Sequence, residues 1–535
     1  MQLIHKLRQI TVVRYLFVGC SSFVVELSSL LFLFHVAHFS LAAATATAYW
    51  IGLVVAFVLQ KLFAFQDYNR ELKALSRQGF YFGLLAVWNW LFTITFVTTF
   101  GSKNVIISRS VAIVIMSGWN YFIYKNVLFK SADHKPKARK VMRWWERVLH
   151  DPLLRVSLLV VAMWRIVLEL WNQVLGHWLQ RQPDLSANVL QWRHWDGDWY
   201  MSIIREGYAP VDPDWHINVA FFPAYPQIVR VVSNIVHVDP LYVGLVLNIF
   251  LTVAVVYLLM KLAALIAARN GLSLTRSKQV AIMSAVALLA YPASFFMAAF
   301  YADALLVLGF VGAIYMALTK RLLLAVPFMI AASASKITGS VAVVTVGVIV
   351  LEQWWQERGS LWQLSKRWAI AGLGVLGLAA YMLYSWMRFG SPLFFYYAEK
   401  AWGRADGGFF VKRIAAYYLH MFEPGYYGSW YNYAMMLFMM ILPFLVLGAG
   451  LFIARRYKTY WPLVLGFFTI LLPLSTGIID SLNRYCLVAI PLVPFIVTWL
   501  LGKIRPAWLY AVLGLSAISM LVFAVGFLDG RWFAG

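Results

Sequence analysis

Two carboxylates lie close together in a part of the chain that should face water, within a protein that is otherwise strongly apolar. The segment Gln191-Trp-Arg-His-Trp-Asp196-Gly-Asp198-Trp-Tyr200 places Asp196 and Asp198 two positions apart, beside His194. It directly follows an apolar stretch, so we expect it at a membrane surface, where carboxylates cost solvation energy and usually have a function. A carboxylate within hydrogen-bond reach of a hydroxyl can remove its proton as that hydroxyl attacks, which is general-base catalysis.

The sequence leaves open which of the two aspartates would act. Residues i and i+2 share a face in an extended segment and diverge on a helix. Asp196 and Asp198 are both candidates for the base, and Asp198 could instead orient an acceptor or hold the geometry of Asp196. Two acids in a water-facing loop can also be merely solvated.

Composition sets the class of protein. The chain has 535 residues, of which 62% are hydrophobic and only 13% charged, with a mean hydropathy of +0.73. Apolar runs of about 20 residues recur from end to end and can cross a bilayer as helices. We therefore expect an all-α polytopic membrane protein. The net charge of +23 comes from Lys and Arg in short loops, which indicates orientation and not nucleic-acid binding. With Cys20 and Cys486 alone, no disulfide or zinc framework is expected.

The first domain is predicted over residues 1–130, with spans at 15–36, 42–64, 78–99 and 107–128. Two of its spans end alike, because Phe57-Val-Leu-Gln-Lys61-Leu-Phe-Ala-Phe65 matches Tyr121-Phe-Ile-Tyr-Lys125-Asn-Val-Leu-Phe129 in spacing. Glu26 is an acid inside the first span and should have a partner within the bundle. Lys61 and Lys125 are candidate functional residues, with snorkelling to the inner headgroups as the alternative.

These features, with Arg14-Tyr15-Leu-Phe-Val-Gly19, resemble the GtrA family of small four-span membrane proteins. The resemblance implies handling of polyprenyl-phosphate-linked sugars. The usual family pattern has Asn-Arg where Gln60-Lys61 and Tyr124-Lys125 stand here.

Residues 131–152 are predicted to be a basic cytoplasmic linker, and residues 153–535 a second domain. Its expected spans are 153–175, 238–268, 279–297, 299–319, 322–335, 337–351, 368–388, 431–454, 459–476, 485–502 and 506–527. Basic loops place the N-terminus inside and the loops 176–237 and 389–430 outside. The short pair 322–335 and 337–351 has basic flanks on both sides, so it should enter and leave the membrane on one side with Lys336 near its tip.

Several motifs of the second domain occur in an order that resembles the PIG-V-like (GPI mannosyltransferase II) family of the GT-C superfamily, over about 153–510. They are Trp195-Asp196-Gly197-Asp198-Trp199-Tyr200, Gly207-Tyr208, Phe221-Phe222-Pro223-Ala-Tyr225-Pro226, Tyr291-Pro292, Tyr301-Ala-Asp303, Lys336-Ile-Thr338-Gly339, Phe389-Gly390-Ser391-Pro392, Trp402-Gly403-Arg404 and Arg484-Tyr485. The family has Arg where Lys336 stands. The Phe221–Pro226 motif favours an architectural role. The resemblance implies transfer of a sugar from a polyprenyl phosphate with inversion.

A departing lipid phosphate needs positive charge at its oxygens, which Lys or Arg near the membrane surface can supply. Arg can grip phosphate through two hydrogen bonds, whereas Lys acts as a point charge. The candidates for binding the substrate and its phosphate are Lys336, Arg404, Arg484, Tyr485, His194, Lys400 and Trp402. Asp303 has an alternative structural role as the partner of Lys336.

The sequence thus predicts a GT-C glycosyltransferase, a hexosyltransferase and specifically a mannosyltransferase, of a prokaryotic inner membrane. The expected partners are a polyprenyl-phosphate-linked sugar, a lipid or glycan acceptor and membrane lipid, with no nucleic acid and no strictly required metal or other cofactor. The N-terminal domain would present or flip the donor. The alternatives are a sugar-lipid transporter or flippase without transferase chemistry, and a non-catalytic assembly subunit.

Overall fold

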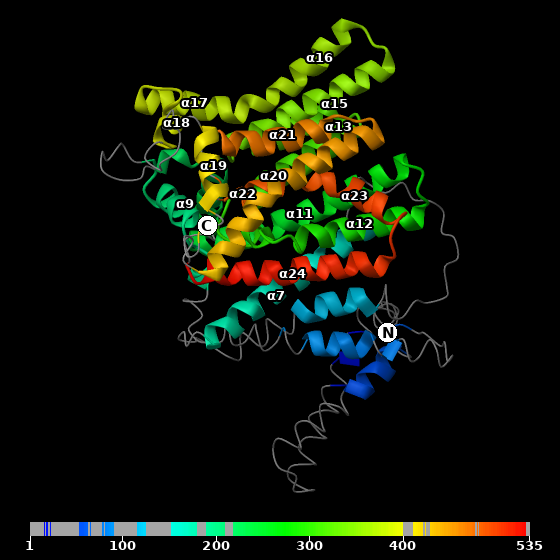
Figure 1. Ribbon diagram of the computed structural model, residues 1–535. Helices are drawn as coiled ribbons and strands as arrows, with labels where there is room; N and C mark the ends of the chain where they lie inside the picture. The colour runs from blue at the N-terminus through cyan, green and yellow to red at the C-terminus, as the bar shows by residue number, and fades with distance from the viewer. Residues whose placement is uncertain are drawn as a thin grey trace, which may run out of the picture. The chain divides into compact units, whose positions relative to one another are not determined.

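The computed structural model describes a large part of the chain, and every regular element in that part is helical (Figure 1). The described residues are 15, 18, 19, 22, 53–61, 65, 78, 79, 81–89, 92, 115–124, 151–178, 189–208, 218–399, 410–420, 423, 429–476, 479 and 481–530. The chain divides into two compact units, Met1–Met142 and Arg143–Gly535. The division falls within 131–152, the segment that the sequence analysis assigns to the linker.

The first unit has an aromatic core of its own. Its described buried residues are Tyr15, Val18, Phe65, Phe82, Leu85 and Tyr124. Lys61 is only 5% exposed, and its Nζ donates a hydrogen bond of 2.6 Å to Gln78 Oε1. Within the described part of this unit, Lys61 is therefore held by a polar partner. Glu26 and Lys125 lie outside the described residues.

The second unit is a bundle of helices that run mostly along a common direction (Figure 1). The helices are α7 (Pro152–Trp178), α9 (Asp196–Arg205), α10 (Ala224–Val236), α11 (Pro240–Arg269), α12 (Leu274–Leu289), α13 (Asp303–Leu318), α14 (Leu322–Ser333), α15 (Val341–Glu357), α16 (Leu361–Gly372), α17 (Leu376–Phe389), α18 (Phe394–Ala398), α19 (Phe410–His420), α20 (Trp430–Tyr457), α21 (Trp461–Leu474), α22 (Leu482–Tyr485), α23 (Val493–Leu500) and α24 (Pro506–Leu528).

Within the described residues, six helical segments are long and apolar enough to cross a membrane, and α13, α14 and α21 are shorter apolar helices. The six are Pro240–Arg269, Ile337–Glu357, Leu361–Phe389, Trp430–Tyr457, Leu482–Leu500 and Ala507–Leu528. The fold class predicted from the sequence, an all-α polytopic membrane protein, is confirmed. The predicted outer loops also contain short helices, α9 and α10 in the first and α18 and α19 in the second.

One predicted span ends earlier than expected. The sequence predicts a span to residue 297, but α12 ends at Leu289, and a turn with a 3-10 segment, Ser294–Met297, leads to α13. Pro292 disfavours continuation of the helix, because it lacks an N–H to donate. Backbone groups freed by such a break need other partners when buried. The buried Asn248 side chain supplies them, since its Nδ2 donates to the carbonyls of Ala299 and Tyr301.

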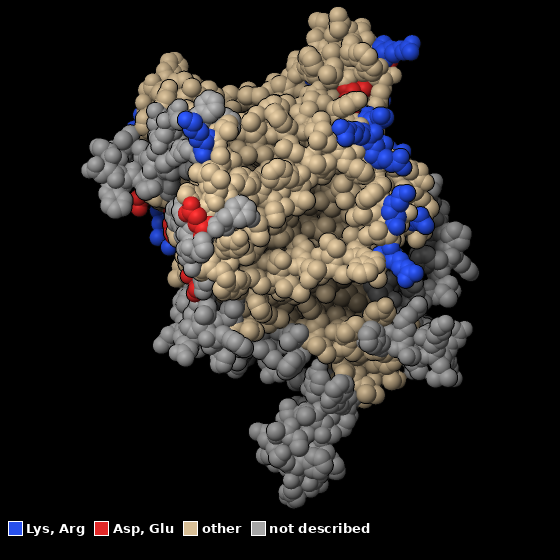
Figure 2. Space-filling view, viewed as in Figure 1, with Lys and Arg blue, Asp and Glu red and all other residues tan. Residues whose placement is uncertain are grey.

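The basic connections meet at one end of this bundle. Glu357, the last residue of α15, pairs with Lys320 after α13 at 2.6 Å and with Arg367 of α16 at 2.8 Å. Figure 2 shows Lys and Arg side chains gathered along this end, on the right. The hairpin of α14 and α15 enters and leaves at the same end, as its basic flanks predict. Lys336 lies at its tip, where Ile337–Ser340 form a 3-10 turn that continues into α15.

Candidate active site

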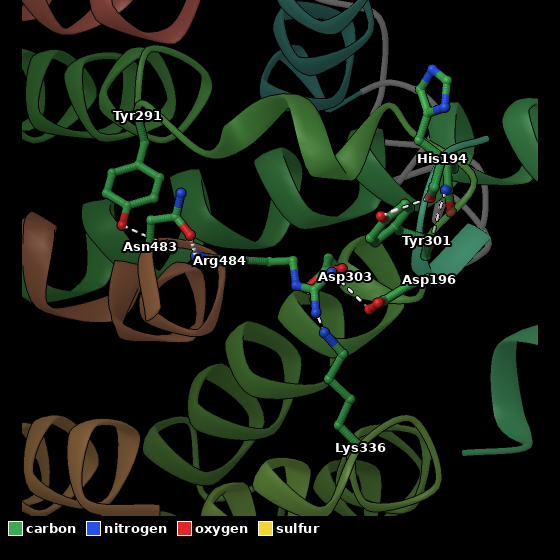
Figure 3. A network of polar contacts seen from close by, with 9 residues as sticks. His194, Asp196, Tyr291, Tyr301, Asp303, Lys336, Asn483 and Arg484 are labelled. Atoms are coloured by element: carbon green, nitrogen blue, oxygen red, sulfur yellow. Dashed lines mark hydrogen bonds and ion pairs between the residues drawn. The ribbon is translucent and has the colours of Figure 1, made fainter. Parts of the chain in front are cut away.

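The charged side chains of Asp196, Asp303, Lys336 and Arg484 meet in one cluster (Figure 3). Arg484 Nη1 lies 2.7 Å from Asp196 Oδ2, and Arg484 Nε lies 3.9 Å from Asp303 Oδ1. Lys336 Nζ donates to Asp303 Oδ1 at 3.0 Å. The exposed fraction of the Arg484 side chain is 3% and that of Asp303 is 1%, whereas Asp196 is 19% exposed. Two carboxylates thus balance two cations. Asp196 is more exposed to solvent than Arg484, the cation with which it pairs.

Helix starts bring these residues together. Asp196 and Asp303 are the first residues of α9 and α13, and Lys336 immediately precedes the helical turn that leads into α15. The start of a helix carries a partial positive charge from its unsatisfied N–H groups, so a carboxylate is stabilised there. The two aspartates therefore gain from their own helices as well as from the cations.

A tight turn presents Asp196. Trp195 adopts a φ of 54°, and the amide N–H groups of Gly197 and Asp198 donate to the carbonyls of His194 and Trp195. A Cβ at Gly197 would lie 3.1 Å from Arg193 Cγ, which explains why glycine suits this position. The positive φ of Trp195 and the glycine at position 197 thus place both aspartates in the first turn of α9.

The same segment is bonded to the turn that carries Asp303. The Phe300 amide N–H donates to the Trp192 carbonyl at 2.9 Å, and the Tyr301 hydroxyl donates to the His194 carbonyl at 2.9 Å. These bonds join two segments that are more than a hundred residues apart in sequence. They fix the Asp196 turn against the start of α13.

Asp196 and Asp198 point to different partners, because they lie on a helix and not on an extended strand. Asp196 contacts the buried Arg484, whereas Asp198 is 56% exposed and its Oδ1 lies 2.8 Å from Arg193 Nε. Sequence reasoning did not select Arg193. The signal that could have found it is its position five residues before Asp198, with a turn between them. The geometry separates the two carboxylates into an inner and an outer one.

The hairpin tip that carries Lys336 is tightly packed. A Cβ on Gly339 would collide with the backbone carbonyl of Ala332, so only glycine fits without a shift of the turn. The Ala224 amide N–H, within the Phe221–Pro226 motif, donates to the Ala334 carbonyl at 3.0 Å. This motif therefore supports the hairpin tip, in agreement with the architectural role favoured from the sequence.

An aromatic wall surrounds the charged cluster. The Arg484 guanidinium carbon lies 5.2 Å from the ring centre of Tyr301 and 5.7 Å from that of Tyr485, and Lys336 Nζ lies 5.1 Å from the Tyr485 ring. Such contacts hold a cation through the negative face of the ring. Burial raises the pKa of Tyr200 in α9 well above its ordinary value, and the charges of Asp196 and Asp303 raise it further. Tyr200 therefore remains a neutral phenol.

The remaining residues predicted from the sequence divide into two groups. The His194 backbone accepts the Tyr301 hydroxyl, while its ring packs 5.8 Å from Phe527 and is turned away from Arg484 in Figure 3. Lys400, Trp402 and Arg404 lie outside the described residues. Across the described part of the chain, no group of three or more His, Cys, Asp or Glu residues is placed to hold a metal ion.

Comparison with known families gives two matches, one on each side of residues 131–152. A family model described as GtrA/DPMS, transmembrane domain, matches residues 14–129. A second, described as Mannosyltransferase (PIG-V), matches residues 184–406. The chain joins a GtrA domain to a PIG-V domain. No curated protein sequence matches it.

The PIG-V match makes the second unit a membrane glycosyltransferase, since that family is one of mannosyltransferases. The match includes Asp196, Asp198, Asp303 and Lys336, and it ends before Arg484. The PIG-V segment thus supplies both carboxylates of the cluster and one of its cations. The second cation comes from α22, beyond the matched residues.

Proposed function

We propose that this protein transfers a hexose, mannose in the first instance, from a polyprenyl-phosphate donor to a lipid or glycan acceptor on the outer face of the membrane. The transfer inverts the anomeric carbon, as in GT-C enzymes. The observation that carries the proposal is the pairing of a partly exposed carboxylate, Asp196, with a buried cation, Arg484, at 2.7 Å. In this proposal the acceptor hydroxyl and the sugar enter between Asp196 and Arg484, so that the base and the phosphate-binding group face opposite sides of the reacting carbon.

Asp196 is the general base in this proposal. The acceptor oxygen attacks the anomeric carbon while its proton passes to Asp196, and the bond from that carbon to the phosphate oxygen breaks. The electron pair of that bond leaves with the polyprenyl phosphate, which gains one negative charge. Lys336 and Arg484 stabilise the departing phosphate, so no acid is needed to protonate it. Asp198, with Arg193, orients the acceptor from the more exposed side.

The cluster is neutral before the reaction, and this balance decides when the positive charge of Arg484 becomes free for the leaving phosphate. Asp196 and Asp303 balance Lys336 and Arg484 before the reaction. When Asp196 takes the acceptor proton, its charge disappears and Arg484 loses its closest anionic partner. The leaving phosphate gains its charge in the same step. Arg484 can therefore exchange one anionic partner for another without an uncompensated charge in a buried site, which would be costly.

The GtrA domain serves the same substrate by presenting or flipping the donor. A donor released beside the PIG-V domain of the same chain experiences a high effective concentration, which raises its occupancy without tighter binding. The N-terminus would lie on the inner side of a prokaryotic inner membrane. In this proposal Lys336 and Arg484 supply the positive charge that the donor phosphate needs, so transfer should not require an added metal and should continue in EDTA.

The experiment uses the purified full-length protein in detergent, with synthetic polyprenyl-phosphate-mannose and a panel of lipid and glycan acceptors. The variant is Asp196→Asn, and Asp198→Asn is the matched control, because it makes the same change two residues away in the same helix. We expect Asp196→Asn to lower the rate by about 10²- to 10⁴-fold, the usual contribution of a general base. Asp198→Asn should lose less, because in this proposal Asp198 orients the acceptor but does not take its proton.

Two results would count against the proposal. Equal losses in the two variants would remove Asp196 from its special role. Absence of transfer by the native protein with every donor and acceptor, while labelled donor still moves across liposomes that contain the protein, would favour a transporter.

A further inference from the structure

A second group of charged residues lies in α7, before the PIG-V match begins, and the proposed mechanism does not use it. Arg165 and Glu169 are one helical turn apart, and Arg165 Nη2 lies 3.5 Å from Glu169 Oε2. Both side chains are 17% exposed in a helix of mostly apolar residues. Charged groups in such helices are costly and are kept where they serve a purpose.

Both residues of this pair also bind the segments that form the active site. The Arg165 guanidinium carbon lies 4.3 Å from the centre of the Trp192 ring, and its Nη1 donates to the Ala298 carbonyl at 3.1 Å. Glu169 Oε2 accepts a hydrogen bond of 3.2 Å from Trp192 Nε1. Trp192 is fully buried and lies four residues before Asp196, while Ala298 lies five residues before Asp303.

The two segments held by this pair are the ones already joined by the Phe300–Trp192 backbone bond. We propose that Arg165 and Glu169 are positioning residues for the transfer reaction. They hold the turn that carries Asp196 and the turn that carries Asp303 in fixed positions relative to each other. The inference depends on the proposed function. It assigns to α7 a role in placing the base relative to the cation pair, without contact with substrate.

A simpler explanation is that Arg165 and Glu169 only neutralise each other inside the bundle. The two explanations differ when both charges are removed together. Replacing a whole buried ion pair by apolar residues of similar size often leaves stability unchanged or raises it. If neutrality is the whole role, the double replacement keeps activity. If positioning is the role, the fold survives and catalysis falls, because small displacements of catalytic groups are costly.

The test is the double variant Arg165→Met with Glu169→Met, measured as the purified full-length chain with polyprenyl-phosphate-mannose as donor. We expect kcat to fall about 100-fold, the scale for a displacement of about 1 Å. The KM for donor should change by less than about threefold, and the thermal unfolding midpoint should stay close to the native value. Lys320→Met is the control at the far, basic end, where the Lys320–Glu357 pair is exposed, and it should keep the native kcat.

A second variant covers the case in which the double variant does not fold. Trp192→Phe removes the indole N–H that donates to Glu169, together with part of the ring volume, and keeps a smaller aromatic ring against Arg165. We expect its kcat to fall about tenfold, again with little change in donor KM, because an imperfectly held loop misplaces the base. Native kcat in Trp192→Phe, or in a folded double variant, overturns the inference. These results are distinct from failure of the proposed function, in which the native protein itself transfers no sugar.

Discussion

Asp303 is the most deeply buried member of the charged cluster, and its removal gives the most informative perturbation. Its Oδ1 accepts from Lys336 Nζ at 3.0 Å and lies 3.9 Å from Arg484 Nε, while its Oδ2 has no hydrogen-bond partner among the described residues. Asp303→Asn keeps the size of the side chain and removes its charge. Lys336 and Arg484 are then balanced by Asp196 alone.

The expected loss follows from that imbalance. Breaking a buried pair by removing one partner costs about 3–5 kcal/mol, since a buried charge is left uncompensated. Lys336→Met should cost a similar amount, because it leaves Asp303 with the more distant Arg484. The combined variant removes one charge of each sign and restores neutrality. We expect its loss to be about 2 kcal/mol smaller than the sum of the single losses, as for residues in direct contact.

The assay is thermal unfolding in detergent, followed by tryptophan fluorescence, for the native protein and these variants. Both single variants should unfold at lower temperature than the native protein, and the combined variant should lose less stability than the sum of the two single losses. Sugar transfer should stay low in the combined variant, because Lys336 no longer meets the phosphate. A combined variant whose loss equals or exceeds the sum of the two single losses would refute the argument that charge balance stabilises this site.

Three further outcomes follow from features outside the cluster. Burial would raise the pKa of Asp151, but hydrogen bonds with Lys261, the Leu153 amide and Tyr257 hold it below the ordinary value. The native protein should therefore be more stable than Asp151→Asn by about 2 kcal/mol at pH 7, and thermal unfolding should show this difference fading as pH falls below the ordinary aspartate pKa of about 3.9 and on through the lower pKa of folded Asp151. Gly339→Ala should lower sugar transfer and the unfolding midpoint together, because the added Cβ meets the Ala332 carbonyl. Phe527→Ala should destabilise by about 3–5 kcal/mol in the same unfolding assay, since this fully buried ring packs on Phe295, Phe296 and Tyr301.

The membrane helices could be predicted well from the sequence, because apolar runs of sufficient length determine them. The hairpin with Lys336 at its tip could also be predicted, since basic residues flank both of its ends. The break after Leu289 could not be placed, because the turn that follows is as apolar as a helix. Its stability depends on Asn248, whose bonds to distant carbonyls no local pattern indicates.

The candidate site could be predicted only in part. Asp196, Lys336 and Arg484 stand out as charges beside apolar segments, and the fold brings them together. The separate directions of Asp196 and Asp198 depend on α9 beginning at Asp196, which the turn at Trp195 fixes. The contacts of Arg165 with Trp192 and Ala298 join distant segments through side-chain geometry, so spacing in the sequence could not reveal them.

The origin of Arg484 in α22 has a consequence for biosynthesis. Asp196 is translated long before Arg484, so a growing chain holds an acid whose counter-ion has not yet been made, whereas Asp303 is followed much sooner by Lys336. Until α22 enters the bundle, Asp196 must stay hydrated or take up a proton, because a buried unpaired charge is costly. Completion of the charged cluster is therefore tied to insertion of the last helices.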